Sequence, residues 1–209
     1  MPGTIRRVTA VATACVAATS AALLSTAPAS AAGGWDITPG GNFTATASPW
    51  QATDAGTGGT LSCSSLILRG QLLSGVAPTS AIGEFTGATF SNCSGGGGAF
   101  PLSLSLTGVP WGISATGYDQ ASGTVSGTIG GLGVHLSGTC IADIGGATPT
   151  AAGVSFTYRN ATHILTIGAA GDLHVWNVTG LCLGLLNSGD SIAPEAFDVE
   201  PPQNIVPAG

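Results

Sequence analysis

Apolar and small polar residues alternate along much of this chain, and this period of two constrains the fold more than any other sequence feature. The pattern is clearest in residues 102–107, 124–129, 132–137 and 154–159, where almost every second residue is apolar. Successive side chains of a strand point to opposite faces, so each segment predicts a strand with one buried and one hydrated face. Such strands are typical of antiparallel sheets.

Glycine-rich turns separate these segments from further candidate strands. We expect those strands at residues 42–47, 60–68, 81–90, 111–116, 162–167, 173–179 and 191–199. Helices are disfavoured because the chain has 34 Gly and no Lys, and each Gly costs about 1 kcal/mol inside a helix. The sequence therefore predicts an all-β protein, an antiparallel β-sandwich or barrel of about 10–12 short strands.

The first 31 residues are predicted to be a cleaved signal peptide. Arg6 and Arg7 precede an uncharged, Ala-rich segment that ends with the A-x-A sequence of residues 29–31, and this order is typical of exported proteins. A membrane anchor over this segment and lipidation of Cys15 are the alternatives. We expect an all-β domain over residues 32–200 and a Pro-rich tail over residues 201–209.

The charge balance excludes one class of partner. After residue 31 the chain has ten acids against only Arg69 and Arg159, which gives a formal net charge of −8. Nucleic acid is not expected as a partner, because phosphate binding needs clustered Lys or Arg. No second apolar stretch of about 20 residues is present, so we expect no membrane span in the mature chain and a secreted or cell-surface location.

Four cysteines follow the predicted cleavage site, namely Cys63, Cys93, Cys140 and Cys182. An even number in an exported chain predicts two disulfides, for which three pairings are possible. We favour Cys63–Cys93 and Cys140–Cys182, because each pair closes a local loop. The wide spacing disfavours a zinc site, which usually needs ligands two to four residues apart, and no cofactor is expected.

Motifs of catalysis are missing from the sequence. It contains no G-x-S-x-G, P-loop or H-E-x-x-H motif. Residues able to act as acids or bases are scattered, namely Glu84, Asp119, His135, Asp143, His163, Asp172 and His174. His163 and His174 lie on adjacent predicted strands that we expect to pair as a hairpin. A secreted hydrolase is the third functional hypothesis, because the members of a Ser–His–Asp triad can be distant in sequence.

Trp35 and Trp50 flank the first predicted strand near an end that we expect to be exposed. They are the candidate ligand platform, because an exposed aromatic face can stack on a sugar ring, whereas Trp111 and Trp176 are expected in the core. A carbohydrate-binding module is accordingly the alternative function, with cell-surface polysaccharide as the partner.

Several segments carry a resemblance to known exported proteins. Residues 35–41 (WDITPGG), 90–93 (FSNC) and 180–190 (GLCLGLLNSGD) resemble a group of small exported proteins of high-GC Gram-positive bacteria. Residues 90–93 together with 106–111 (LTGVPW) are similar to the PraB-type exported surface proteins. The resemblance implies a surface or matrix location and carries over no site residues.

The favoured function is therefore a non-enzymatic cell-surface or matrix protein that takes part in adhesion or self-association. Exposed sheet edges are usually protected by charged residues, above all Lys, and this chain contains no Lys. Unless the sheet closes into a barrel, its edges can pair with those of other copies.

We predict that the protein in culture medium begins at Ala32, because signal peptidase cleaves after the A-x-A sequence. N-terminal sequencing of the secreted protein tests this. Recovery of a chain that still carries Arg6 and Arg7 from the membrane fraction would contradict it.

Overall fold

The computed structural model describes residues 34–148, 153–169 and 171–209, and in that part of the chain all regular structure is β-strand. The predicted signal peptide lies outside these residues. Eight strands close an antiparallel barrel: β10 (Trp111–Asp119), β11 (Thr124–Ile129), β14 (Val154–Arg159), β15 (Ile164–Ile167), β18 (Glu195–Glu200), β2 (Gly41–Ala47), β5 (Ser65–Leu72) and β7 (Ala81–Ser91).

A second eight-stranded sheet continues this barrel along its long axis. Its order is β17 (Ser191–Ile192), β16 (Leu173–Gly180), β13 (Cys140–Gly145), β12 (Gly133–Gly138), β9 (Phe100–Thr107), β8 (Cys93–Gly95), β4 (Thr60–Cys63) and β3 (Trp50–Thr53). Each of these strands is the chain neighbour of one barrel strand, as β9 is of β10 and β12 is of β11. The two sheets therefore consist of eight long strands, each interrupted once.

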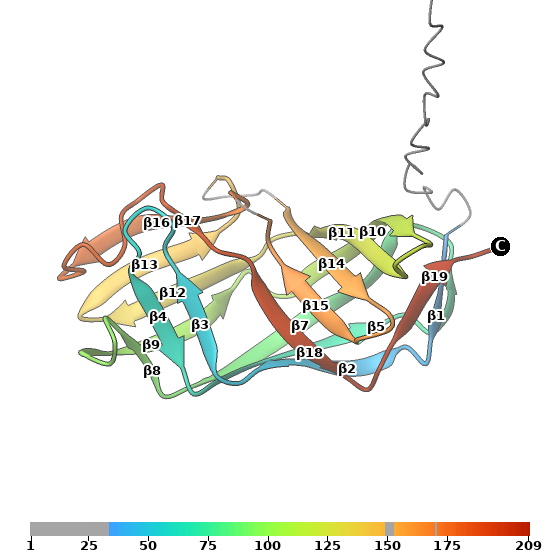
Figure 1. Cartoon of the computed structure of the whole chain (residues 1–209), viewed down its shortest axis with the longest axis horizontal. Helices are drawn as coiled ribbons and strands as arrows, with labels where there is room; N and C mark the ends of the chain where they lie inside the picture. Colours follow the sequence, from blue (N-terminus) through green and yellow to red (C-terminus); the bar gives the residue numbers. More distant parts are fainter. Residues whose placement is uncertain (1–33, 149–152, 170) are drawn as a thin grey trace, which may run out of the picture.

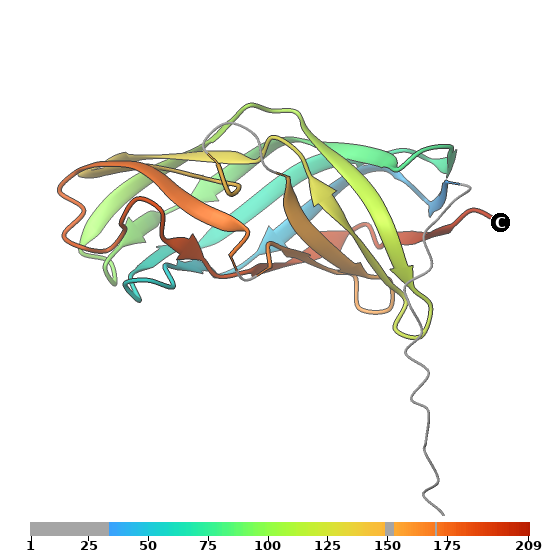
Figure 2. The ribbon, with the colours of Figure 1, turned by 90° about the horizontal axis from the view of Figure 1, so that it is seen from above.

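The edges of the second sheet, β3 and β17, meet at a bridge between Asp54 and Ile192. Two backbone hydrogen bonds support it, Ala55 N–H to the Ser191 carbonyl at 2.8 Å and Ala193 N–H to the Thr53 carbonyl at 3.0 Å. The second sheet is thereby closed into a ring, and the molecule is an elongated tube (Figures 1 and 2).

Proline and glycine interrupt the long strands where the barrel meets the second sheet, a region that we call the waist. Pro49 separates β2 from β3, and Gly108 and Pro110 lie between β9 and β10. Proline cannot donate a ladder hydrogen bond. Gly108 and Gly131 have φ angles of +69° and +76°, which other residues rarely adopt. The interruptions also explain why the described residues form 19 strands where the sequence predicted about 10–12.

The core fills the inside of the tube. In β14, for example, Val154, Phe156 and Tyr158 are buried, whereas Thr157 and Arg159 are exposed. The alternation seen in the sequence thus separates an apolar interior from an exterior of Ser, Thr and Gly. The predicted all-β class and antiparallel pairing are confirmed.

Both predicted disulfides are present. Cys63–Cys93 joins β4 to β8, and Cys140–Cys182 joins β13 to the loop of residues 181–190, which we call the tip loop. On the chain-entropy model each stabilises the fold by roughly 3–4 kcal/mol. They are compatible with an extracellular location. Within the described ranges, no helix has the length and apolar character needed to cross a membrane.

A three-stranded sheet, the end sheet, lies at the end of the barrel away from the tip loop (Figure 1). It consists of β19 (Asn204–Pro207), β1 (Trp35–Thr38) and β6 (Gly75–Ala77). Residues 204–207, in the segment predicted as a Pro-rich tail, pair with β1 along its whole length. Gln203 holds this segment in place, since its buried side chain accepts a hydrogen bond from Gly40 N–H at 3.0 Å and donates one to the Pro201 carbonyl at 2.9 Å.

We predict that Gly70→Ala destabilises the fold by about 1–3 kcal/mol, the usual cost of overpacking a core. A Cβ atom at Gly70 would lie 2.6 Å from the Phe43 ring and 2.7 Å from the Glu84 carbonyl oxygen. Gly87, on the neighbouring strand, is the matched control, because a Cβ atom there meets nothing within 4 Å. Urea denaturation measures both variants, and equal stability of the two would contradict the packing described.

Candidate functional site

The end sheet carries free strand edges. The barrel closes on itself, and the edges of the second sheet, β3 and β17, meet at the single Asp54–Ile192 bridge, whereas β6 and β19 each have a long edge that no described strand pairs with. Val76 on β6 is 65% exposed and Leu73, which precedes this strand, is 48% exposed. The β6 edge therefore combines unpaired backbone groups with apolar side chains in water.

A second exposed apolar pair lies at the opposite end of the molecule. Leu181 and Leu183 of the tip loop are 66% and 70% exposed, and the Cys140–Cys182 disulfide lies between them in sequence. Unlike the β6 edge, this pair lies in a loop and offers no regular row of backbone groups for strand pairing.

His135 and Asp143 form an ion pair on the outer face of the second sheet. His135 Nδ1 lies 2.7 Å from Asp143 Oδ1, and the Asn177 side-chain amide donates to Asp143 Oδ2 at 2.8 Å. Hydrogen bonds from Asn177 and then from His135 hold the pKa of Asp143 below its usual value. Ser105 is the cross-strand neighbour of His135, so three residue types of a catalytic triad lie in one row.

The setting of this row does not suit catalysis. The side chains of His135 and Asp143 are 40% and 39% exposed, and a catalytic pair depends on a site that excludes water. An exposed ion pair of this kind contributes little to stability either. We interpret the row as surface structure.

The other candidate acids and bases do not assemble. Asp119 accepts hydrogen bonds within its own turn, from Ala121 N–H at 3.0 Å and from the Ser122 hydroxyl at 2.6 Å. Asp172 accepts bonds from the Ser155 hydroxyl and backbone N–H and from Ala169 N–H. These bonds lower the pKa of both carboxyl groups.

His163 and His174 do not face each other across a hairpin. β15 and β16 are consecutive parts of one long strand, and each pairs with other strands. His174 instead lies between the carbonyl oxygens of Gly171 and Gly189, at 2.8 and 3.1 Å. Glu84 stays isolated on β7, half-buried opposite Gln71. No group of three or more His, Cys, Asp or Glu within the described ranges is arranged to hold a metal ion.

Trp35 and Trp50 are only 1% and 7% exposed. Trp35 lies on β1, and Trp50 packs edge-on against Phe90, with 6.3 Å between ring centroids. Neither ring offers a free face to a sugar, which speaks against the predicted platform. The sequence predicted an exposed position for both residues, but Trp35 is buried on β1 of the end sheet and Trp50 on β3 of the second sheet.

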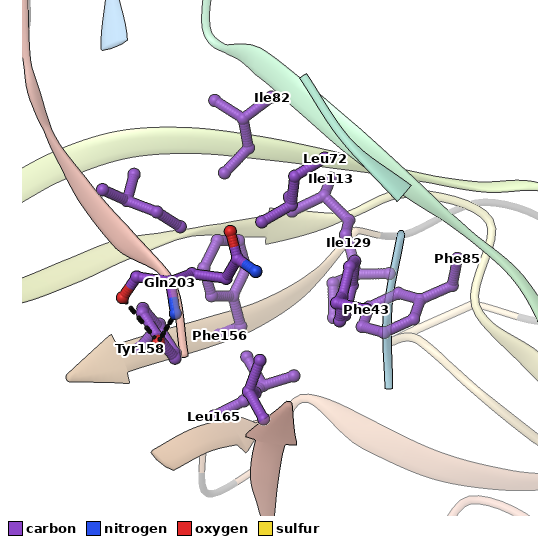
Figure 3. Close-up of a pocket in the computed structure, with 12 residues that line it drawn as sticks. Phe43, Leu72, Ile82, Phe85, Ile113, Ile129, Phe156, Tyr158, Leu165 and Gln203 are labelled. Carbon is purple, nitrogen blue, oxygen red and sulfur yellow. Dashed lines mark hydrogen bonds between the residues drawn. The ribbon is translucent and has the colours of Figure 1, made fainter. Parts of the chain in front are cut away.

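One interior cavity, of about 30 Å³, lies inside the barrel (Figure 3). Its polar groups are already paired, because the Tyr158 hydroxyl donates to the Gln203 carbonyl at 2.8 Å and accepts from Gln203 N–H at 3.1 Å. The remaining lining is apolar, as for Phe43, Phe85 and Phe156. We regard this space as a packing defect.

A larger cavity, of about 70 Å³, lies at the waist. We call it the waist chamber, and its walls include Leu68, Leu106, Trp111, Val134, Leu173 and Glu195. Glu195 is its single ionisable group. It points inward because it lies opposite Ile167 and shares the inward face of β18 with Phe197 and Val199. Burial raises the pKa of Glu195 to about 8.

Sequence reasoning missed Glu195, although a signal was present. Residues 195, 197 and 199 form one face of a predicted strand, and two of them are Phe and Val. An acid in phase with this apolar face is the anomaly that identifies the residue.

Comparison with protein-family models, with curated proteins and with solved structures finds no match to this chain.

The raised pKa of Glu195 predicts that stability falls between pH 4.5 and about 8. In this window the folded state retains a proton that the unfolded state has released, so rising pH favours unfolding. Glu195→Gln should flatten the dependence, whereas Glu200→Gln, on the outer face of the same strand, should not. Urea midpoints at pH 5, 6.5 and 8 provide the measurement, and the same slope in wild type and Glu195→Gln would contradict the prediction.

Proposed function

We propose that this protein acts without catalysis outside the cell, as a cell-surface or matrix component that associates with its own copies through the end sheet. The observation that carries the proposal is the β6 edge, where unpaired backbone groups lie beside the exposed side chains of Leu73 and Val76. Two such edges can join as an extended sheet without any change of fold.

Closure of the tube restricts where association can occur. A closed barrel has no free edge, so strand pairing must use strands outside the barrel, such as those of the end sheet. The long sides present mainly Ser, Thr and Gly and offer few apolar contacts. Head-to-head pairing of end sheets gives dimers, and use of both β6 and β19 gives longer chains of molecules.

The net charge opposes uncontrolled assembly. Ten acids against Arg69 and Arg159 make neighbouring copies repel one another, and salt screens this repulsion. Association is therefore expected to be weak at low salt and stronger at high salt.

The other two functions receive less support. A carbohydrate-binding module lacks its platform, because Trp35 and Trp50 are buried. A hydrolase would depend on the His135–Asp143 pair, which is well exposed on an outer sheet face. An exported protein with two disulfides and no assembled catalytic group among its described residues is better suited to a structural or binding role.

We predict that sedimentation velocity detects dimers or larger species whose fraction rises from low to high salt. Val76→Lys should abolish them, because it places a charge on the β6 edge. It also lowers the net negative charge, so a loss of association cannot result from greater repulsion.

Leu181→Lys is the matched control. Leu181 is 66% exposed against 65% for Val76, the charge change is the same, and the residue lies at the other end of the molecule. This variant should associate like the wild type. A wild-type protein that stays monomeric at every salt concentration, or association that only Leu181→Lys abolishes, would overturn the proposal.

A further inference from the structure

The waist chamber differs from an ordinary packing gap because solvent reaches its walls. Leu106 on β9 and Val134 on β12 lie on the inward face of their strands, and Leu132 directly precedes β12; each of the three is only partly buried. Leu136, two residues beyond Val134 on the same face, is completely buried. Leu104, the cross-strand neighbour of Leu136, is also only partly buried, so the partial exposure extends from the waist into the second sheet.

The chamber is a built recess with one polar group. Its walls come from both halves of the tube, with Leu68 and Trp111 from the barrel and Leu106 and Leu173 from the second sheet. The indole N–H of Trp111 is already occupied, because it donates to the Thr107 carbonyl at 2.8 Å. The Glu195 carboxyl makes no hydrogen bond to the described residues.

The volume of the chamber and the Glu195 carboxyl on its wall together indicate which kind of molecule could bind there. A dry apolar cavity of about 150 Å³ binds benzene, and room for one water begins at about 10–15 Å³. On the benzene scale of about 25 Å³ per heavy atom, a chamber of about 70 Å³ holds about three heavy atoms, so the rest of a longer molecule would continue through the opening. A mainly hydrocarbon molecule replaces the missing packing contacts, and one oxygen atom gives the carboxyl group a partner.

We propose that the waist chamber binds a small, mainly hydrocarbon molecule with a single acceptor oxygen, such as a ketone, and that Glu195 donates a hydrogen bond to this oxygen. The binding step requires a protonated carboxyl group, and the raised pKa of Glu195 keeps it protonated at neutral pH. This site is separate from the end sheet and does not depend on self-association.

The test uses NMR on the monomeric protein at low salt and pH 6, with labelled methyl groups. The probe is 2-butanone, and its comparison is 2-methyl-1-butene, which has the same shape with a methylene group in place of the oxygen. We expect saturable shifts for the methyl groups of Leu106 and Val134 and intermolecular NOEs from 2-butanone to them. These NOEs locate the probe in the wild-type protein without any substitution.

Substitutions then isolate the role of the carboxyl group. Glu195→Leu should weaken 2-butanone binding about 3- to 10-fold, the typical value of one hydrogen bond, and should leave 2-methyl-1-butene binding unchanged or tighter. Glu195→Gln keeps a donor and should retain most of the ketone affinity. Glu200→Gln, on the outer face, is the matched control and should behave as wild type.

Two outcomes would overturn the inference. The first is a 2-butanone titration in which the waist residues do not shift up to the solubility limit, or in which NOEs arise only elsewhere. The second is an equal loss of affinity for both probes in Glu195→Leu, which would show that the loss does not depend on a hydrogen bond to the ketone oxygen. Neither outcome bears on association through the end sheet, which sedimentation measures independently.

Discussion

Closure of the backbone hydrogen-bond ladder is the constraint on which the rest of this structure depends. A chain so poor in charge has few other means of protecting sheet edges, because Lys and inward-pointing charges are the usual devices. In the barrel every strand has two partners, and in the second sheet the Asp54–Ile192 bridge joins the remaining edges. The outside can then be Ser, Thr and Gly with few free edges, and β6 and β19 of the end sheet are two of them.

Closure also creates the waist. Eight long strands cannot keep both a continuous ladder and the close packing of a narrow tube along their whole length, because strands twist and coil. The chain resolves the conflict with local breaks at Pro49, Gly108 and Pro110, and each break removes side chains or ladder bonds at the same level of the tube. The waist chamber lies where those breaks coincide. Its position is thus a consequence of how the strands are interrupted.

The sequence was sufficient to predict the class of fold but not the order in which the strands pair. Alternation in segments such as 154–159 predicts strands and their buried faces, and loop closure favoured the correct disulfide pairing of Cys140 with Cys182. The alternation of apolar and polar residues contains no information about which strands pair with each other. It therefore could not show that β15 and β16 are parts of one interrupted strand. Because they do not form a hairpin, His163 and His174 do not face each other as expected. Composition likewise assigned residues 201–209 to a tail, because the strand partners of β19 and the Gly40 partner of the Gln203 side chain lie more than 160 positions away in sequence.

Local sequence rules are expected to fail where a protein has a function or stores strain. The interior of this tube follows the rule of apolar residues inside almost everywhere, and Tyr158 and Gln203 satisfy each other where polar groups enter it. Glu195 is different, because an inward acid beside Phe197 and Val199 costs stability without a compensating partner among the described residues. A Leu at this position would match the alternation, and a Gln would avoid the ionisation. An acid at the accessible part of a mainly apolar interior is better explained by a molecule that it contacts than by the fold that it weakens.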